Sequence, residues 1–439
     1  LFYIKSFNLS PDEAYYWVWS KNLQLSYYDH PGMIAWLLKI GNVFEGFGNT
    51  IRWPIVLLGH LSLLIWIRIL DNLSCCEAAS APCKTKEASS VWLWLVLCSP
   101  LLGFGSIIAT PDVPVVFFWS LATYAFIKID SRVPRTASSF RHLYVLLGIS
   151  LGLGFCSKYH IVIFPFLMVI YILIERKWTL LKFGPVGLTI LFGLVFSLPV
   201  LVWNFQHDFI SFKFQINHGL GKKNWKPFWT YSYLMGQVLA VFPIVFWAAL
   251  KAKVSEKNRF LIYTAWGPLL FFFFSSFKGK VEMNWPIVAI PAVFALAATN
   301  KKLYNSYKYI NSLWLVLILV FATNLFIPYL KETPTKLQEP IYYQSLKDLP
   351  NKYVPLFAGT YQMAAQLWYM NKSPIFKLYK MSREDFFDHL EGAKPKTDKF
   401  YLVADLDHSF PDWMSAQSYS VNLLEKIDSK FILYEVIKK

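Results

Sequence analysis

Charged residues are scarce in this sequence. Only 16% of its 439 residues are Asp, Glu, Lys or Arg, whereas 55% are hydrophobic and 18% are aromatic. This composition excludes a disordered chain and is too apolar for an ordinary soluble enzyme. It is typical of a protein that crosses a membrane repeatedly.

Several motifs of common enzyme classes are absent. The sequence has no Walker-type glycine loop, no dinucleotide-binding glycine fingerprint, no Cys-x-x-Cys pair and no His-Glu-x-x-His helix. These absences argue against nucleotide-driven chemistry and against a zinc protease. Cysteine is also rare, and Cys75, Cys76 and Cys83 share one polar loop without a nearby histidine. Reduced cytosolic thiols are therefore favoured over a metal cluster.

Ten apolar runs follow one another, each close to the roughly 17–25 residues that a bilayer crossing demands. They span 52–71, 89–108, 113–129, 142–156, 160–175, 184–203, 229–250, 259–276, 285–300 and 310–330. Lysines and arginines gather in every second connection, which predicts that these connections are cytoplasmic. The net charge of +16 fits this bias better than it fits nucleic-acid binding.

The same topology places the acids, histidines and tryptophans of the remaining loops on the outer face, where we expect the function. Three parts are predicted. Residues 1–51 form an outer juxtamembrane loop with amphipathic helices, 52–330 a membrane domain of about ten helices, and 331–439 a small α/β domain outside the membrane. The chain opens at Leu1 without methionine, which we interpret as the tail of a missing first membrane helix, with a true short start as the alternative.

The α/β domain is predicted from a change of composition near residue 331. Strands are expected over 352–358, 376–379, 400–404 and 431–437, and a helix over 361–370.

Asp12 and Glu13 stand side by side in a stretch that precedes every long apolar run. On a helix their side chains diverge by about 100°, so both cannot face one substrate. One is expected to act as a base toward an acceptor hydroxyl, and the other as a helix cap or a supporting partner. Helix capping alone accounts for the stretch equally well.

Further outer residues each have a functional and a simpler structural interpretation. Asp29 and His30 begin a second predicted helix, and Asp112 begins a membrane span, so all three also fit a helix start. Lys158 lies on the side that the positive-inside bias disfavours, which indicates either an anion-binding role or a side chain reaching toward the interface.

Two outer loops carry candidate binding residues. The loop 204–228 contains Gln206, His207 and His218. It suits a lid that reaches a lipid headgroup, or ordinary anchoring at the interface. In the loop 277–286, Lys278 and Lys280 with Glu282 could clamp a phosphate.

Five motifs occur in an order that resembles the bacterial branch of the dolichyl-phosphate-mannose protein mannosyltransferase superfamily. That branch includes the lipid A aminoarabinose and galacturonic acid transferases. The motifs are Asp12-Glu13-Ala14-Tyr15-Tyr16-Trp17, Tyr28-Asp29-His30-Pro31, Ala109-Thr110-Pro111-Asp112, Ser157-Lys158-Tyr159 and Lys280-Val281-Glu282-Met283-Asn284-Trp285-Pro286. The resemblance covers most of 8–300, and the C-terminal domain resembles the family only in position.

The resemblance implies the GT-C fold, a polytopic α-helical membrane protein with a small extracytoplasmic α/β C-terminal domain. It also implies an inverting glycosyltransferase of the bacterial cytoplasmic membrane with its active site on the periplasmic side. The implied partners are a polyprenyl-phosphate sugar donor, membrane lipids and a lipid or protein acceptor, foremost lipid A, lipopolysaccharide or another envelope glycolipid.

The resemblance also implies roles for single residues. Asp12 matches the acid that acts as the base or orients the acceptor, and Asp29 matches a second acid near the donor phosphate or a divalent metal ion. His30 stands where aminoarabinose transferases carry a lysine, and Gly32 replaces the second proline of the usual pair. The candidates for donor phosphate or metal are Asp29, His30, Lys158, Tyr159, Lys278, Lys280 and Glu282. The candidates for acceptor or lid are Asp112, Gln206, His207, His218, Asn284, Trp285 and Tyr361.

Other functions remain open at this stage. A protein O-mannosyltransferase would share the chemistry, and a non-catalytic glycolipid-binding scaffold or a flippase would share the membrane architecture. A transporter is disfavoured, because the acids lie at span ends and no internal repeat is visible.

Overall fold

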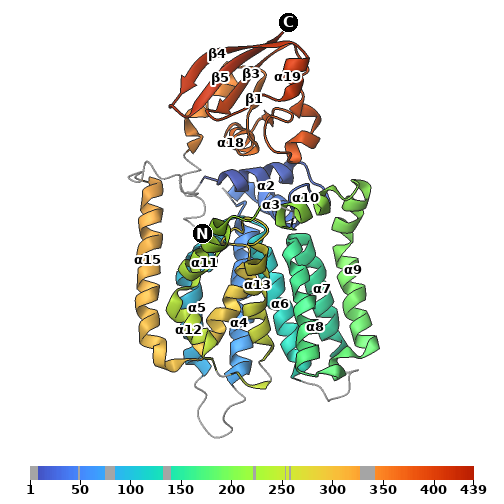
Figure 1. The fold of residues 1–439 in the computed structure, drawn as a ribbon, viewed down its shortest axis with the longest axis vertical. Coiled ribbons are helices and arrows are strands. Elements are labelled where there is room, and N and C mark those ends of the chain that lie inside the picture. The colour runs from blue at the N-terminus through green and yellow to red at the C-terminus, as the bar shows by residue number, and fades with distance from the viewer. Residues whose placement is uncertain are drawn as a thin grey trace.

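The protein is a helical bundle with a five-stranded sheet at one end and short helices between the two (Figure 1). The structure is a computed structural model that describes residues 8–47, 50–74, 85–131, 140–220, 224–252, 254–256, 259–326 and 342–439. The bundle is built from the apolar runs of the sequence, and its helices are α4 (Trp53–Ser74), α5 (Thr85–Cys98), α6 (Asp112–Asp130), α7 (Arg141–Ser157), α8 (Ile163–Ile174), α9 (Phe183–Gln206), α11 (Pro227–Val241), α12 (Pro243–Leu250), α13 (Phe260–Ser275), α14 (Ile290–Ala298) and α15 (Tyr304–Phe326).

The bundle helices fit a membrane-spanning part. Among the described residues, three helices are long and apolar enough to cross a membrane, and up to six spans result if each of three bent pairs counts as one. Shorter apolar helices, such as α7 and α13, pack beside them. Each of the ten predicted runs is largely helical in this structure.

Two runs that the sequence predicts as single crossings are sharply bent. The run 229–250 breaks by 84° between α11 and α12, where Phe242 has a φ of 73°. Pro243 follows, and a proline disfavours helical geometry in the residue before it. The run 89–108 bends by 70° after α5. Pro100 begins η2 (Pro100–Phe104) at this bend, and η3 (Gly105–Ile107) follows directly. Because of this second bend, several residues of 101–108 line a cavity.

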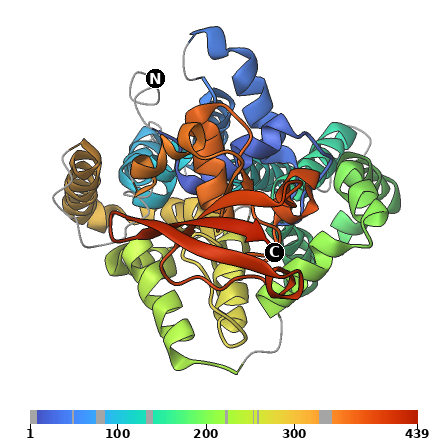
Figure 2. The same cartoon turned by 90° about the horizontal axis from the view of Figure 1, so that it is seen from above.

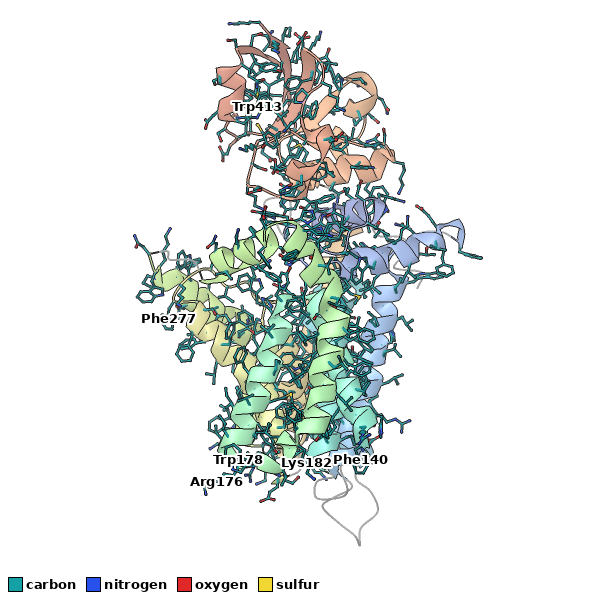
Figure 3. All side chains as sticks on the ribbon, turned by 90° about the vertical axis from the view of Figure 1, so that its right-hand side faces the viewer. Phe140, Arg176, Trp178, Lys182, Phe277 and Trp413 are labelled. Atoms are coloured by element: carbon teal, nitrogen blue, oxygen red, sulfur yellow. The ribbon has the colours of Figure 1, made fainter. Side chains whose placement is uncertain are left out.

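Three helices outside the bundle lie between it and the sheet, namely α2 (Pro11–Lys21), α3 (Met33–Val43) and α10 (Ile210–Leu220) (Figure 1). Helix α3, followed by η1 (Glu45–Phe47), extends beyond the edge of the bundle (Figures 2 and 3). Helix α2 begins with a capping box, in which the Ser10 hydroxyl accepts from the Glu13 N–H and the Glu13 carboxylate accepts from the Ser10 N–H. Pro11 at the first helical position favours the same start.

The C-terminal domain is a mixed sheet with the strand order β2-β1-β3-β5-β4. Its strands are β1 (Leu356–Ala358), β2 (Phe376–Lys377), β3 (Lys399–Asp405), β4 (Tyr419–Ile427) and β5 (Phe431–Lys438). β1 pairs in parallel with β2 and β3, whereas β5 pairs antiparallel with β3 and β4. The helix predicted over 361–370 is confirmed as α18 (Tyr361–Asn371).

Strand β4 was not predicted from the sequence. It is an edge strand whose residues are half-buried or exposed, and its register shifts between Leu423 and Glu425. The adjacent Leu423 and Leu424 break the alternation that would have indicated a strand. The remaining short helices are η5 (Tyr159–Val162), η6 (Trp178–Leu181), η8 (Ile287–Ala289), η9 (Lys301–Leu303), η10 (Gln344–Leu346), α17 (Leu349–Lys352), η11 (Phe386–His389), η12 (Glu391–Ala393) and α19 (Asp412–Ala416).

The C-terminal domain shares a hydrophobic core with the opening segment. Ala14 and Val18 of α2 are buried together with Met363 and Leu367 of α18. Since α2 also packs on the bundle side, the sheet domain is held at one fixed end of the molecule. Figure 3 shows the opposite end, where the labelled Arg176 and Lys182 lie far from Trp413 of the sheet domain. One of the connections predicted to be cytoplasmic, which contains Arg176 and Lys182, thus lies at the end opposite the sheet domain.

A buried lysine inside the sheet domain provides a stability test. The Nζ of Lys377 lies 2.6 Å from a carboxylate oxygen of Asp385 and 2.6 Å from one of Asp388, and its side chain is fully buried. Lys377→Met would leave two buried carboxylates without their cation, so we expect the free energy of unfolding to fall by about 3–5 kcal/mol. Thermal unfolding of the purified protein, followed by tryptophan fluorescence, measures this loss.

The matched control is Lys399→Met. Lys399 also pairs with a carboxylate, Glu435 at 2.6 Å, but its side chain is half exposed. Exposed pairs contribute little. Equal losses in the two variants would contradict the account of the domain core.

Candidate active site

The Glu13 carboxylate accepts hydrogen bonds from a side chain and from two backbone N–H groups. It accepts from the Arg52 Nε at 2.7 Å and from the Arg52 Nη2 at 2.6 Å. It also accepts from the backbone N–H of Ala109 at 2.8 Å and of Ser10 at 2.9 Å. Burial alone would raise the pKa of Glu13, but Arg52 and these N–H groups hold it below its usual value. Glu13 is therefore an ionised structural group that joins α2, the start of α4 and the loop before α6.

Asp12, one position earlier, faces a different environment. It lines a cavity of about 330 Å³ between α2 and the bundle. The walls of this cavity are mostly apolar and include Leu63, Trp66, Trp92, Val96, Leu102 and Val116. The polar residues that line it include Ser10, Asp12, Thr110, Asp112, Glu282 and Asn284. The predicted divergence of Asp12 and Glu13 is thus observed, and Asp12 is the acid of this pair that meets the cavity.

Asp112 also lines the cavity and is held by two side chains from distant parts of the sequence. The Lys158 ammonium lies 2.7 Å from its Oδ1, and the Asn284 amide donates to its Oδ2 at 2.8 Å. Asp112 and Lys158 are both buried. Residues from three separate sequence motifs therefore meet at the Asp112 carboxylate. Lys158 forms a buried ion pair there and does not reach toward the interface.

Asp29 lies outside the set of residues that line the cavity and ties the opening segment to the C-terminal domain. The Tyr15 hydroxyl donates to its Oδ2 at 2.5 Å, and the Arg383 Nη1 lies 3.0 Å from its Oδ1. The Gln215 amide of α10 donates to its backbone carbonyl. Burial raises the pKa of Asp29 even though Arg383 and Tyr15 oppose the shift.

The other residues that the sequence predicts to bind the donor phosphate lie around these acids. His30 lies beside the Tyr16 ring, with 6.3 Å between ring centroids. The Tyr159 hydroxyl is 2.9 Å from that of Ser211 in α10. Lys278 and Lys280 are exposed, and Lys280 pairs with Glu282 at 3.0 Å. Of these, only Glu282 lines the cavity.

The predicted acceptor and lid residues also divide into near and remote groups. The Tyr361 hydroxyl donates to the Asp12 Oδ1 at 3.5 Å, although Tyr361 is not one of the residues that line the cavity. Gln206 and His207 are exposed at the end of α9, where His207 stacks on Trp203 with 4.0 Å between ring centroids. Trp285 packs beside His160 and Phe272, and the side chain of His218 lies outside the described part of the structure.

Two functional arginines were missed by the sequence analysis. Arg52 follows the opening segment directly and is the cation of the buried pair with Glu13. Arg383 lies in the C-terminal domain, about which the motifs say nothing, yet it contacts Asp29. Once Glu13 is known to be buried, a cation that binds it is expected, and Arg52 is that cation. No local sequence pattern indicates Arg383.

The residues do not fit the divalent metal ion that the sequence resemblance raised. Within the described ranges, no three His, Cys, Asp or Glu side chains gather as a metal site would require. Asp29, the candidate ligand, is bound instead by an arginine and a tyrosine hydroxyl, which are hydrogen-bond donors. We derive no step through a metal.

Comparison with known proteins gives three concordant findings. Residues 29–203 match the family model described as dolichyl-phosphate-mannose-protein mannosyltransferase. The chain is 26% identical over 305 residues to the lipid A galacturonosyltransferase RgtD of Rhizobium johnstonii, which covers 65% of this chain and 59% of that protein. It is 28% identical over 299 residues to the undecaprenyl phosphate-alpha-4-amino-4-deoxy-L-arabinose arabinosyl transferase of Edwardsiella ictaluri, which covers 64% and 50%.

The fold has a counterpart among solved structures. ArnT from Cupriavidus metallidurans bound to undecaprenyl phosphate matches with a TM-score of 0.66 over 97% of this chain and 92% of that one, at 13% identity. The likeness shows that the two chains share the GT-C fold. The chain spans about half the length of the curated relatives it matches, 59% and 50% for the two named above.

The two neighbouring acids are expected to respond in opposite ways to loss of charge. Glu13→Gln would leave Arg52 buried without its counterion, so we expect the free energy of unfolding to fall by about 3–5 kcal/mol. Asp12→Asn removes a charge from a cavity wall outside the capping box and should leave stability nearly unchanged. Thermal unfolding of both variants beside the parent protein checks this. A Glu13→Gln protein as stable as Asp12→Asn would show that the buried pair is not structural.

Proposed function

We propose that the chain is a member of the dolichyl-phosphate-mannose-protein mannosyltransferase superfamily and an inverting glycosyltransferase, a proposal that its family-model match, its relatives and its fold support. It moves a sugar from a polyprenyl-phosphate carrier to an acceptor, foremost lipid A or another glycolipid of the bacterial envelope. The first relative named above supports a lipid acceptor, because it is named for lipid A, and the second supports the donor, because it is named for an undecaprenyl phosphate-linked sugar.

The observation that carries this proposal is the cavity with apolar walls and acids among its polar residues. Its volume of about 330 Å³ falls in the range of small-molecule sites. Tryptophans and aliphatic side chains suit the isoprenoid part of the carrier, whereas carboxylates and an amide suit the hydroxyl groups of a sugar. A site that needed an activated nucleotide would require different groups, and a polyprenyl phosphate is already a good leaving group.

We assign the base to Asp12 by comparing the environments of the acids. Glu13 is covered by Arg52 and two backbone N–H groups, and both Asp112 oxygens are bound by Lys158 and Asn284. Glu282 also lines the cavity, but it is exposed and pairs with Lys280 at 3.0 Å. Asp12 lies in the first turn of α2, where the helix dipole favours its ionised form, and it lines the cavity. It is thus the acid placed to take a proton from a bound hydroxyl.

The reaction is then a single displacement. The acceptor hydroxyl gives its proton to Asp12, and the acceptor oxygen forms a bond to the anomeric carbon of the sugar. On the opposite side of that carbon, the bond to the phosphate oxygen breaks, and polyprenyl phosphate leaves with the electron pair. One displacement inverts the anomeric configuration. Lys158 has three N–H donors, one of which serves Asp112, and its charge favours the developing anion.

The active site is proposed to face the periplasm, with the protein in the cytoplasmic membrane. The cavity, α2 and the sheet domain lie at one end of the bundle, and the connection that contains Arg176 and Lys182 lies at the other (Figure 3). The positive-inside bias assigns the second end to the cytoplasm.

Asp12→Asn tests the catalytic assignment. The variant keeps the size of the side chain and removes its basicity, so we expect kcat to fall by about 10²–10⁴-fold. Release of labelled polyprenyl phosphate and mass spectrometry of the glycosylated lipid measure this in liposomes. The control is Asp398→Asn, an exposed aspartate of the sheet domain, which should transfer at the parent rate.

The outcomes separate the candidate functions. Near-normal transfer by Asp12→Asn would refute the base assignment. Binding of the donor without turnover by the parent protein would favour a non-catalytic scaffold or a flippase, and transfer to a peptide instead of a lipid would favour a protein O-mannosyltransferase.

Orientation is tested with two single cysteines placed in a variant whose five native cysteines are serine. Lys426→Cys in β4 and Lys182→Cys before α9 are both exposed positions. A thiol reagent that cannot cross the membrane should label the first in intact spheroplasts and the second only after permeabilisation. Labelling of Lys182→Cys in intact spheroplasts would reverse the topology.

A further inference from the structure

Resting on the proposed function, we propose that Arg383 of the C-terminal domain is a positioning residue of the active site. Its guanidinium group packs on the Tyr361 ring, and the Tyr361 hydroxyl in turn contacts the Asp12 carboxylate. The membrane part of the protein therefore has a complete site only when the C-terminal domain is docked.

The first step is the anchorage of Arg383 on the opening segment. Its Nη1 lies 3.0 Å from the Oδ1 of Asp29, a buried carboxylate. The other oxygen of Asp29 accepts from the Tyr15 hydroxyl at 2.5 Å. The Tyr15 oxygen also accepts from the backbone N–H of Phe386 at 2.8 Å, so the segment that carries Arg383 is tied to the opening segment at both Asp29 and Tyr15.

The second step is the contact between Arg383 and Tyr361. The guanidinium carbon lies 4.7 Å from the centre of the Tyr361 ring, a cation–π distance. On its other side, Arg383 lies 5.8 Å from the ring centre of Phe214 in α10. The guanidinium is thus held between α18 and α10.

The contact between Tyr361 and Asp12 completes the chain. The Tyr361 hydroxyl donates to the Asp12 Oδ1, 3.5 Å away. Because Arg383 packs on the ring of Tyr361, it holds this hydroxyl in the direction of Asp12. A hydroxyl donor beside a carboxylate orients the carboxylate and favours its ionised form.

The chain from Arg383 to Asp12 depends on the shape of arginine. One planar guanidinium serves two partners at the same time, Asp29 through an ion pair and Tyr361 through its ring face. A lysine at this position would keep the charge and the ion pair with Asp29, but an ammonium point charge does not reproduce the planar face that packs on the ring. The two functions of Arg383, docking and positioning, can therefore be separated by one substitution.

The test compares Arg383→Lys, Tyr361→Phe and the double variant in the transfer assay. Arg383→Lys should keep the unfolding temperature of the parent, whereas kcat should fall by about 10- to 100-fold with little change in the donor KM. Tyr361→Phe should show a loss of similar size. Because both residues act on Asp12 through one chain of contacts, the double variant should lose no more than either single variant.

A matched control is Arg259→Lys. Arg259 is also ion-paired with a carboxylate, Glu175 at 2.5 Å, and its side chain is 39% exposed against 46% for Arg383. Arg259 precedes α13 directly and is not one of the residues that line the cavity. Arg259→Lys should therefore leave kcat unchanged. Normal kcat in Arg383→Lys, losses that multiply in the double variant, or an equal loss in Arg259→Lys would overturn the inference.

A second measurement does not need the transfer reaction. Water-soluble carbodiimides modify protonated carboxyl groups, and peptide mass spectrometry reports the modification of Asp12. The titratable neighbours of Asp12 are Tyr16 of its own helix and Tyr361 of α18, and Asp112 and Glu282 also line the cavity. At one fixed pH, Arg383→Lys and Tyr361→Phe should both increase the labelling rate of Asp12.

The two measurements distinguish the failure of this inference from failure of the proposed function. A parent protein that transfers no sugar, in a preparation that still shows faster Asp12 labelling in both variants, would contradict the proposed function and keep the positioning role. Equal labelling of Asp12 in the parent and in both variants would overturn the positioning role, whatever the activity.

Discussion

The buried ion pair between Glu13 and Arg52 is the interaction on which the geometry of the site depends. Both side chains are almost wholly removed from water, and the arginine fork meets both carboxylate oxygens. The same carboxylate accepts from Ala109, three residues before Asp112, so it also fixes the loop that leads into α6. Burying two charges is costly, and the full set of hydrogen bonds around them offsets that cost. As a result α2 has one orientation on the bundle, and Asp12 faces the cavity.

The roles of four acids near the cavity follow from the groups that surround each of them, and these acids are Asp12, Glu13, Asp29 and Asp112. Glu13 is covered by donors, Asp29 is bound by Tyr15 and Arg383, and Asp112 is shared by Lys158 and Asn284. Each of these three joins segments that are distant in the sequence. Asp12 is the one that combines a helix start, a cavity wall and a tyrosine hydroxyl from another domain. The structural acids thus hold in place the acid to which we assign the chemistry.

Much of this arrangement could be predicted from the sequence, because it depends on local patterns. The apolar runs predicted the bundle helices, and the adjacency of Asp12 and Glu13 predicted that they would diverge. The order of the motifs marked Lys158, Asp112 and Asn284 as site candidates, although their meeting at one carboxylate was seen only in the structure. The bend at Phe242 and the irregular strand β4 depend on proline and on register, which periodicity does not capture. Arg383 could not be found in this way, because its partners Asp29 and Tyr361 come from two separate segments that meet only when the C-terminal domain docks on α2.

The central claim is that the cavity beside Asp12 holds the sugar end of a polyprenyl-phosphate donor. A cryo-electron microscopy structure of the Asp12→Asn variant with such a donor tests it most directly. The account predicts density for the sugar against position 12 and Asn284, the phosphate on the side of Lys158, and the first isoprene units against the wall that Trp66 and Trp92 form. Density for the donor outside this cavity, with the sugar remote from position 12, would contradict it.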